Sequence, residues 1–333
     1  MNRNLTSGST VKCLLMFSLP YLFSYFLQTL YGMADLIIVG KLDGVAGTTA
    51  VSVGSQIMHM LTVIIVGLAM GTTVGIGKSV GAGDGWRAAK YIGNLAVLFA
   101  AISVVLAGVL IVLVRPIVSL MSTPADAAAG TAAYLRICFA GIPFITAYNI
   151  ISSVFRGMGD SKTPMYFIAV ACSVNIGLDF LFVGAFDMGP AGAALGTVIS
   201  QAVSVAVSLI FVRRRHDIDL CKEDICPSGG IIGKILRVGA PIAVQDGLIQ
   251  VSFAIITIIA NRRGLSDAAA VGIVEKIIGF LFLVPSSMLS SVSALGAINI
   301  GAEKLWPCGL RFDAVYRGGR SDALHRYLGG RCR

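Results

Sequence analysis

Two carboxylic acids interrupt long apolar stretches of this sequence. Asp35 lies near the end of an apolar run that also contains Pro20, and Asp179 lies deep in the apolar run 165–186. A carboxylate in the hydrocarbon of a bilayer costs several kcal/mol, so an acid at such a position is a candidate functional group. The alternative is that Asp35 lies near a helix end and reaches headgroup water.

Each acid follows another polar residue by four positions. Tyr31 precedes Asp35 and Asn175 precedes Asp179, and residues four apart share one face of a helix. Two carboxylates in one low-dielectric cavity cannot both ionise cheaply, which suits a proton carrier. The same oxygens could bind Na+, so Asp35 and Asp179 form a possible Na+ site. We expect no other metal site and no organic cofactor.

Further polar residues lie in other apolar runs. Asn149 and Thr197 fall at depths that would let them line one cavity with the two acids and their neighbours. The alternative is that each polar group is solvated at a helix end or satisfied by packing. Pro20 removes a backbone hydrogen bond and could serve as a hinge. Gln245 and Asp246 are secondary candidates, for lining a space between two helix bundles.

The composition is that of a helical membrane protein that crosses the bilayer many times. Of its 333 residues 56% are hydrophobic and 13% charged, against about 25% charged in soluble domains. The mean hydropathy is +0.84. The first apolar run is too long for a cleavable signal peptide and lacks a small-residue cleavage site. The seven cysteines are scattered, without the spacing of a disulfide framework or a metal site.

Several other functions are excluded. The net charge of +9 comes from basic residues in loops, as membrane topology requires, and does not indicate nucleic-acid binding. The glycine-rich stretch 71–84 resembles a phosphate loop, but Thr72 replaces a required glycine, so we expect no nucleotide site. With no histidine cluster and no serine or cysteine nucleophile that has an evident partner, the sequence does not indicate an enzyme.

Apolar runs of about 20 residues predict eight membrane-spanning helices. We place them at 14–39, 50–76, 91–114, 133–155, 165–186, 191–212, 238–260 and 268–295. Lys and Arg concentrate on the N-terminal side, and only Lys41, Arg115, Arg136, Arg262 and Arg263 fall on the other. The positive-inside rule therefore predicts a cytoplasmic N-terminus in the cell membrane.

An internal repeat divides the chain. Pro20 and Gly81 recur as Pro241 and Gly301, at an offset of 220 or 221 residues. Two related halves are typical of transporters, although chance similarity between apolar helices is the alternative. We therefore predict a six-helix N-terminal lobe at 1–212, a cytoplasmic linker at 213–237, and the first two helices of a second, incomplete six-helix lobe at 238–303. Residues 304–333, with seven Lys or Arg and two Asp, are expected to be a non-native end or else an amphipathic surface tail.

Five segments carry a resemblance to the multidrug and toxic compound extrusion (MATE) family over about residues 5–303. They are SLPYLFSYFLQTLYGMADLIIVGKL, GKSVGAGD, FRGMGDSKTPM, CSVNIGLDFLFVGAFDMGPAGAALGTVISQ, and GAPIAVQ with ALGAINIGAEK. The resemblance implies twelve helices in two six-helix lobes, and efflux of cationic or amphipathic compounds in exchange for H+ or Na+. The family's polar site positions fall on Tyr31, Asp35, Asn149, Asn175, Asp179 and Thr197.

This chain also departs from the family pattern. The glutamine usual before Asn299 is Ile298, Asp246 follows Gln245 where a small or neutral residue is commoner, and helices 9–12 are missing. We therefore expect a cation-coupled antiporter of small drugs and toxic compounds. One alternative is an inactive truncated fragment of such a transporter. Another is a lipid-linked oligosaccharide flippase of related two-lobe architecture, whose cavity would need more basic residues.

Overall fold

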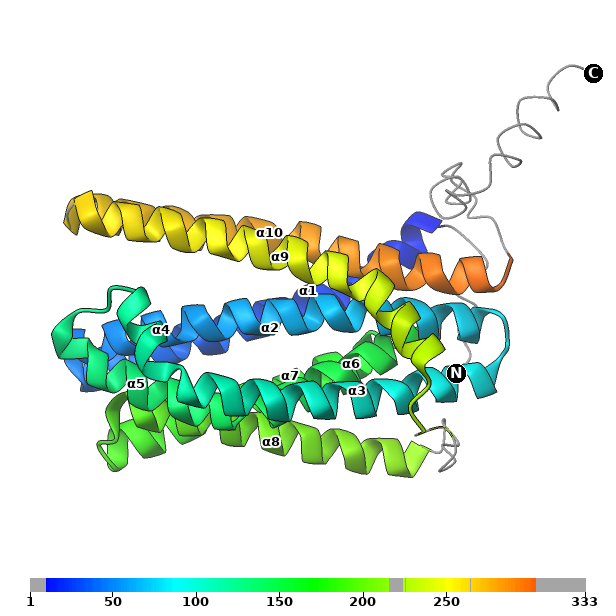
Figure 1. Ribbon diagram of the computed structural model, residues 1–333, viewed down its shortest axis with the longest axis horizontal. Coiled ribbons are helices and arrows are strands. Elements are labelled where there is room, and N and C mark those ends of the chain that lie inside the picture. The colour runs from blue at the N-terminus through cyan, green and yellow to red at the C-terminus, as the bar shows by residue number, and fades with distance from the viewer. Residues whose placement is uncertain (1–9, 216–223, 225, 264, 304–333) are drawn as a thin grey trace, which may run out of the picture.

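The computed structural model describes residues 10–215, 224, 226–263 and 265–303, and its long elements are all helices (Figure 1). These are α1 (Thr10–Leu42), α2 (Gly44–Gly81), α3 (Gly85–Val112), α4 (Val114–Leu120), α5 (Ala125–Ala140), α6 (Ile142–Gly157), α7 (Lys162–Asp179), the π-helix η1 (Phe180–Ala185), α8 (Gly189–Arg215), α9 (Gly229–Arg263) and α10 (Leu265–Gly301). Seven are long and apolar enough to cross a membrane, or eight if α5 and α6 form one span. The predicted helical membrane fold is confirmed.

Some helix boundaries differ from the prediction. The span expected at 133–155 is two helices, α5 and α6, bent by 51°. Pro143 lies in the first turn of α6, and a proline disfavours helical continuation from the residues before it. The last nine residues of the expected linker 213–237 are helical, since α9 begins at Gly229.

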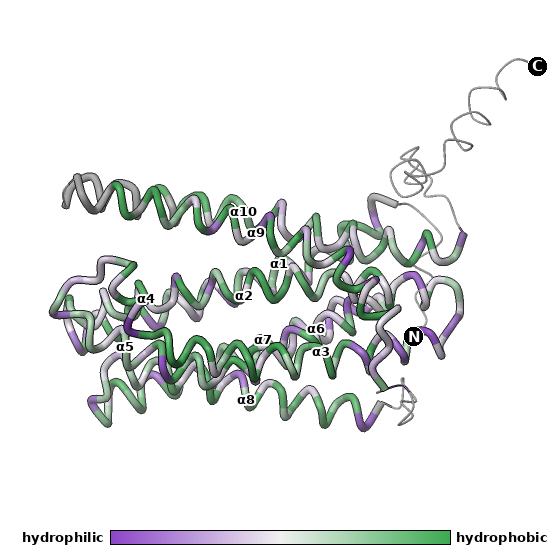
Figure 2. The backbone as a smooth tube through the Cα atoms, in the orientation of Figure 1, coloured by the Kyte–Doolittle hydropathy of each residue, from purple (hydrophilic) through white to green (hydrophobic). Residues whose placement is uncertain are grey.

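The helices lie side by side in one elongated bundle (Figure 1). The α9–α10 pair runs along one side and contacts α1 and α2, which in turn contact α6 and α7. Apolar residues predominate along the long helices, and hydrophilic residues gather mostly at the two ends of the bundle (Figure 2). This pattern fits helices whose outer faces contact lipid.

Buried hydrophobic side chains of the described residues form a small cluster around Phe17 and Tyr21 and two large clusters. One contains Ile38 of α1 and Phe139 of α5, and the other contains Phe99 of α3 and Phe155 of α6, with Tyr31 of α1 packed against it. Asp35 lies on α1 between Tyr31 and Ile38. The first acid therefore lies where the two apolar clusters meet, deep within the bundle.

A reciprocal glycine contact joins α2 to α10. A side chain at Gly81 would collide with the carbonyl of Ile298, and one at Gly301 would collide with the carbonyl of Lys78. Gly81 corresponds to Gly301, and Lys78 to Ile298, at the 220-residue offset of the sequence repeat. Such an exchange of contacts is what a local two-fold axis between α2 and α10 produces, and it supports the internal repeat.

The glycine contact predicts a specific sensitivity to volume. Gly81→Val should lower the thermal unfolding midpoint in detergent, because overpacking costs about 1–3 kcal/mol and here the obstacle is backbone. Gly108→Ala on α3 is the control, since a Cβ there meets nothing within 4 Å. Equal midpoints for the two variants would contradict a close α2–α10 approach.

Candidate functional site

Asp35 and Asp179 meet inside the bundle, where α1 packs against α7. Their side chains are only 3% and 0% exposed. The two carboxyl groups lie within reach of a shared hydrogen bond. In the part of the chain that the structure describes, one oxygen of Asp35 and both oxygens of Asp179 have no hydrogen-bond donor, and no cationic side chain pairs with them. The arrangement concentrates negative charge that these side chains leave uncompensated.

Two neighbouring side chains add polar atoms to the acid pair. The Thr197 hydroxyl of α8 donates to Asp35 Oδ2 at 3.3 Å, which is long for a hydroxyl donor and indicates a weak bond. Asn175 is 1% exposed and lies near Asp35, yet neither its amide nitrogen nor its amide oxygen makes a well-oriented hydrogen bond. Buried polar groups without partners require an explanation, and a bound cation or proton would supply one.

The donor set suits a small hard cation as well as a proton. No group of three or more His, Cys, Asp or Glu side chains that could hold a metal occurs among the described residues. Any cation at the acid pair would therefore need the amide oxygen of Asn175 and the hydroxyl of Thr197 beside the two carboxylates. Such oxygen ligands are those that hard cations prefer.

A glycine on α8 makes room for the second acid. A Cβ at Gly196 would lie 2.5 Å from Asp179 Oδ1, and one at Gly192 would lie 3.0 Å from the backbone of Phe182. The four-residue glycine spacing predicts close helix packing. The structure adds that Gly196 lets the Asp179 carboxyl group lie against α8, a role that the spacing alone does not reveal.

Asp179 is the last residue of α7, and the chain continues from it as the π-helix η1. A π-turn adds one residue to the helical hydrogen-bond register, and such turns occur frequently at functional sites. Asp179 therefore lies where the register changes, and side chains on either side of it face different directions from those of a regular helix. The sequence predicted one continuous span here.

The other predicted site residues lie at different distances from the acids. Tyr31 is one turn before Asp35 and close enough to interact with it electrostatically. Asn149 is buried, but its amide nitrogen donates to the Ile145 carbonyl of its own helix at 2.8 Å. No hydrogen bond joins Asn149 to either acid in the described part of the chain. The adjacent residue Tyr148 lies near Tyr31.

Sequence reasoning missed two neighbours of Asp35 on α5. Tyr134 and Cys138 are buried, and both lie close enough to Asp35 to interact with it electrostatically. They are four residues apart, the same spacing that drew attention to the acids, so this signal could have found them. Their hydroxyl and thiol extend the polar lining around Asp35 from α5.

Pro20, Gln245 and Asp246 lie outside this cluster. Pro20 is inside α1, which continues unbroken to Leu42, and its carbonyl accepts a hydrogen bond from the Ser24 hydroxyl at 2.8 Å. Gln245 is exposed on α9. Asp246 is half-buried, with Oδ2 only 3.3 Å from where a Cβ at Gly67 of α2 would lie.

Comparisons with known proteins agree on one family. Residues 20–181 match the MatE family. "Probable multidrug resistance protein YpnP" of Bacillus subtilis is 30% identical over 296 residues, which cover 89% of this chain and 66% of that protein. "Multidrug export protein MepA" of Staphylococcus saprophyticus is 25% identical, with the same coverage. The chain thus spans slightly less than two thirds of the length of these relatives.

Solved structures share the fold. A crystal structure of a MATE transporter in the straight conformation superposes with a TM-score of 0.77 at 26% identity, covering 90% of this chain and 67% of that one. A MOP superfamily transporter from Pyrococcus furiosus superposes with a TM-score of 0.79 at 25% identity, with the same coverage of both chains.

The buried acid pair should lower the stability of the folded chain. Asp179→Asn should raise the thermal unfolding midpoint in detergent at neutral pH by about 2 °C or more, because the amide removes a buried charge and can donate to Asp35. Asp187→Asn is the matched control, since Asp187 is exposed and its positive φ suits asparagine. A midpoint lowered by Asp179→Asn would show that the charge is compensated.

Proposed function

This chain belongs to the MATE family, and from that premise we propose that it is an antiporter that exports small cationic or amphipathic compounds across the cell membrane in exchange for H+ or Na+. The observation that carries the proposal is the buried Asp35–Asp179 pair, which has no cationic partner among the residues that the structure describes. Relatives named as multidrug resistance and multidrug export proteins support drugs as the substrates.

Charge compensation at the acid pair gives a mechanism. A cationic substrate and a coupling ion each neutralise the same negative charge, so the binding of one weakens the binding of the other. A proton would be shared between the two facing carboxyl groups. Na+ would instead draw on the carboxylate oxygens together with Asn175 and Thr197. Exchange follows when the coupling ion enters from one side of the membrane and the substrate leaves to that side.

Helix packing would turn neutralisation into movement. The acids join α1 to α7, and Gly196 holds Asp179 close to α8, so a change of charge alters the contact between three helices. Pro20 leaves one backbone carbonyl of α1 without its usual donor, which lowers the cost of bending α1 when the acids are neutralised. Two helix arrangements biased by one charge are sufficient for alternating access.

The proposal predicts the behaviour of acid-to-amide variants. The chain should reduce ethidium accumulation in efflux-deficient bacteria, and the purified chain should bind the dye less tightly as pH falls, because protons compete for the carboxylates. Asp35→Asn combined with Asp179→Asn should weaken binding about tenfold or more and abolish its pH dependence. Asp126→Asn, on the exposed start of α5, should change neither.

The outcomes separate the parts of the proposal. Unchanged, pH-dependent dye binding by the double variant would show that the acids are not the coupling site. Dye binding without export would support the binding site but would show that this chain does not export the dye. Measuring efflux under an imposed Na+ gradient and, separately, an imposed pH gradient identifies the coupling ion.

A further inference from the structure

A second buried charge lies at the other end of the bundle, and it is positive. Arg156, in the last turn of α6, is 8% exposed. The ring of Tyr21 on α1 covers its guanidinium group, 4.8 Å from the ring centroid, and Tyr25 is within hydrogen-bonding reach. Fourteen residues of α1 separate Tyr21 from Asp35, which corresponds to about 21 Å along the helix. Arg156 is therefore not a partner of the acid pair.

No carboxylate compensates Arg156 in the described ranges of the chain. Its neighbours are the tyrosines Tyr21, Tyr25 and Tyr148. These are neutral at physiological pH and offer only an aromatic face or a hydroxyl dipole. The carbonyl end of α6 adds a partial negative charge. An unpaired buried cation is strongly unfavourable, so partial charges alone leave the site incomplete.

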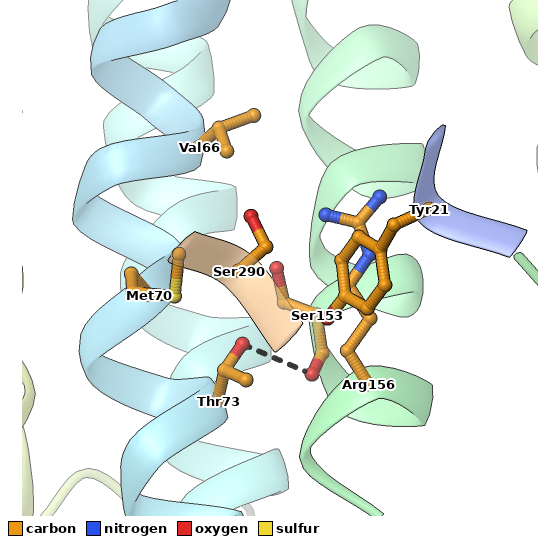
Figure 3. A pocket seen from close by; sticks show the side chains of 7 residues that line it. All are labelled: Tyr21, Val66, Met70, Thr73, Ser153, Arg156 and Ser290. Carbon is orange, nitrogen blue, oxygen red and sulfur yellow. Dashed lines mark hydrogen bonds between the residues drawn. The ribbon is translucent and has the colours of Figure 1, made fainter. Parts of the chain in front are cut away.

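A small cavity beside Arg156 offers space for the missing charge (Figure 3). Helices α1, α2, α6 and α10 enclose it, and the space open to the centre of a water molecule is about 10 Å³. That volume is about the smallest that holds one water molecule, so the space suits a single water or a monatomic ion of comparable size. The guanidinium group of Arg156 lies on one side and Val66 and Met70 on the other, with the hydroxyls of Ser153 and Ser290 between them (Figure 3).

The hydroxyl groups can donate to an occupant. Ser290 Oγ and Tyr25 Oη share one hydrogen bond at 3.1 Å, which uses one of their two protons and leaves the other available. Thr73 Oγ1 donates to the Ser153 backbone carbonyl at 3.2 Å, so the Ser153 hydroxyl is not used by that bond. A guanidinium group and two hydroxyls thus line one small cavity as donors, which suits an acceptor that carries a full negative charge.

We propose that this cavity binds a single halide ion, chloride, held by Arg156, Ser153 and Ser290. Chloride compensates the guanidinium charge fully, whereas water contributes only a dipole. Because Arg156 is on α6, Tyr21 on α1 and Ser290 on α10, the ion also ties α10 to α1 and α6. Bound chloride therefore stabilises the packing of α10 at the end of the bundle where α1 begins.

Halide-dependent stability tests this site. The purified full chain in neutral detergent is heated in sodium chloride, sodium bromide or sodium gluconate, at one fixed Na+ concentration so that any Na+ bound at the acids is constant. We expect a saturable rise of the unfolding midpoint by about 2 °C or more with chloride and bromide, and none with gluconate. Asp35→Asn with Asp179→Asn should keep this response.

Variants assign the effect to the cavity. Arg156→Gln should abolish the halide response, and Arg136→Gln, at an exposed position on α5, should keep it. Ser290→Ala retains the charge but removes a donor, and it should raise the half-saturating chloride concentration by about tenfold. Equal midpoints in chloride and gluconate would show that chloride does not bind to the folded chain and would overturn the proposal. So would a halide response that persists in Arg156→Gln or, if that variant does not fold, an unshifted response in Ser290→Ala.

Discussion

The structure depends on the placement of two carboxyl groups, Asp35 and Asp179, in an apolar interior where no cationic side chain of the described residues pairs with them. Burial of an uncompensated charge strongly lowers the free energy of unfolding. The surrounding packing holds it in place, because Asp35 lies where two apolar clusters meet and Gly196 lets α8 approach Asp179 closely. In return the fold has a site at which a bound cation stabilises the folded chain.

Helix α1 links this acidic site to a basic one. Asp35 lies toward the end of α1, and earlier in the same helix the ring of Tyr21 covers the guanidinium group of Arg156, with Tyr25 within hydrogen-bonding reach. Tyr25 also reaches Ser290 of α10 through a hydrogen bond. A movement of α1 that follows neutralisation of the acids would therefore change the contact between α1 and α10. A halide bound at that contact would oppose the movement.

Much of this arrangement is predictable from the sequence, and the remainder depends on packing. The spacing of Tyr31 with Asp35 and of Asn175 with Asp179 indicates shared helix faces, and apolar length indicates the spans. Depth along a helix does not indicate which way a side chain faces: Asn149 lies at a depth that would let it line a cavity with the acids, and its amide nitrogen donates to the Ile145 carbonyl of its own helix. The π-helix after Asp179 and the room provided by Gly196 arise from contacts between helices, which local spacing does not encode.

The central claim is that substrate and coupling ion compete for the same carboxylates. Proton release on substrate binding tests it most directly, by titrating a cationic dye into the weakly buffered, Na+-free chain and recording the pH change. If H+ is the coupling ion, about one proton should be released per dye molecule bound, and this release should be lost when Asp35 and Asp179 are both asparagine. If Na+ is the coupling ion, added Na+ should instead weaken dye binding, and the double variant should lose that effect. Dye binding that releases no proton and does not respond to Na+ would contradict the central claim.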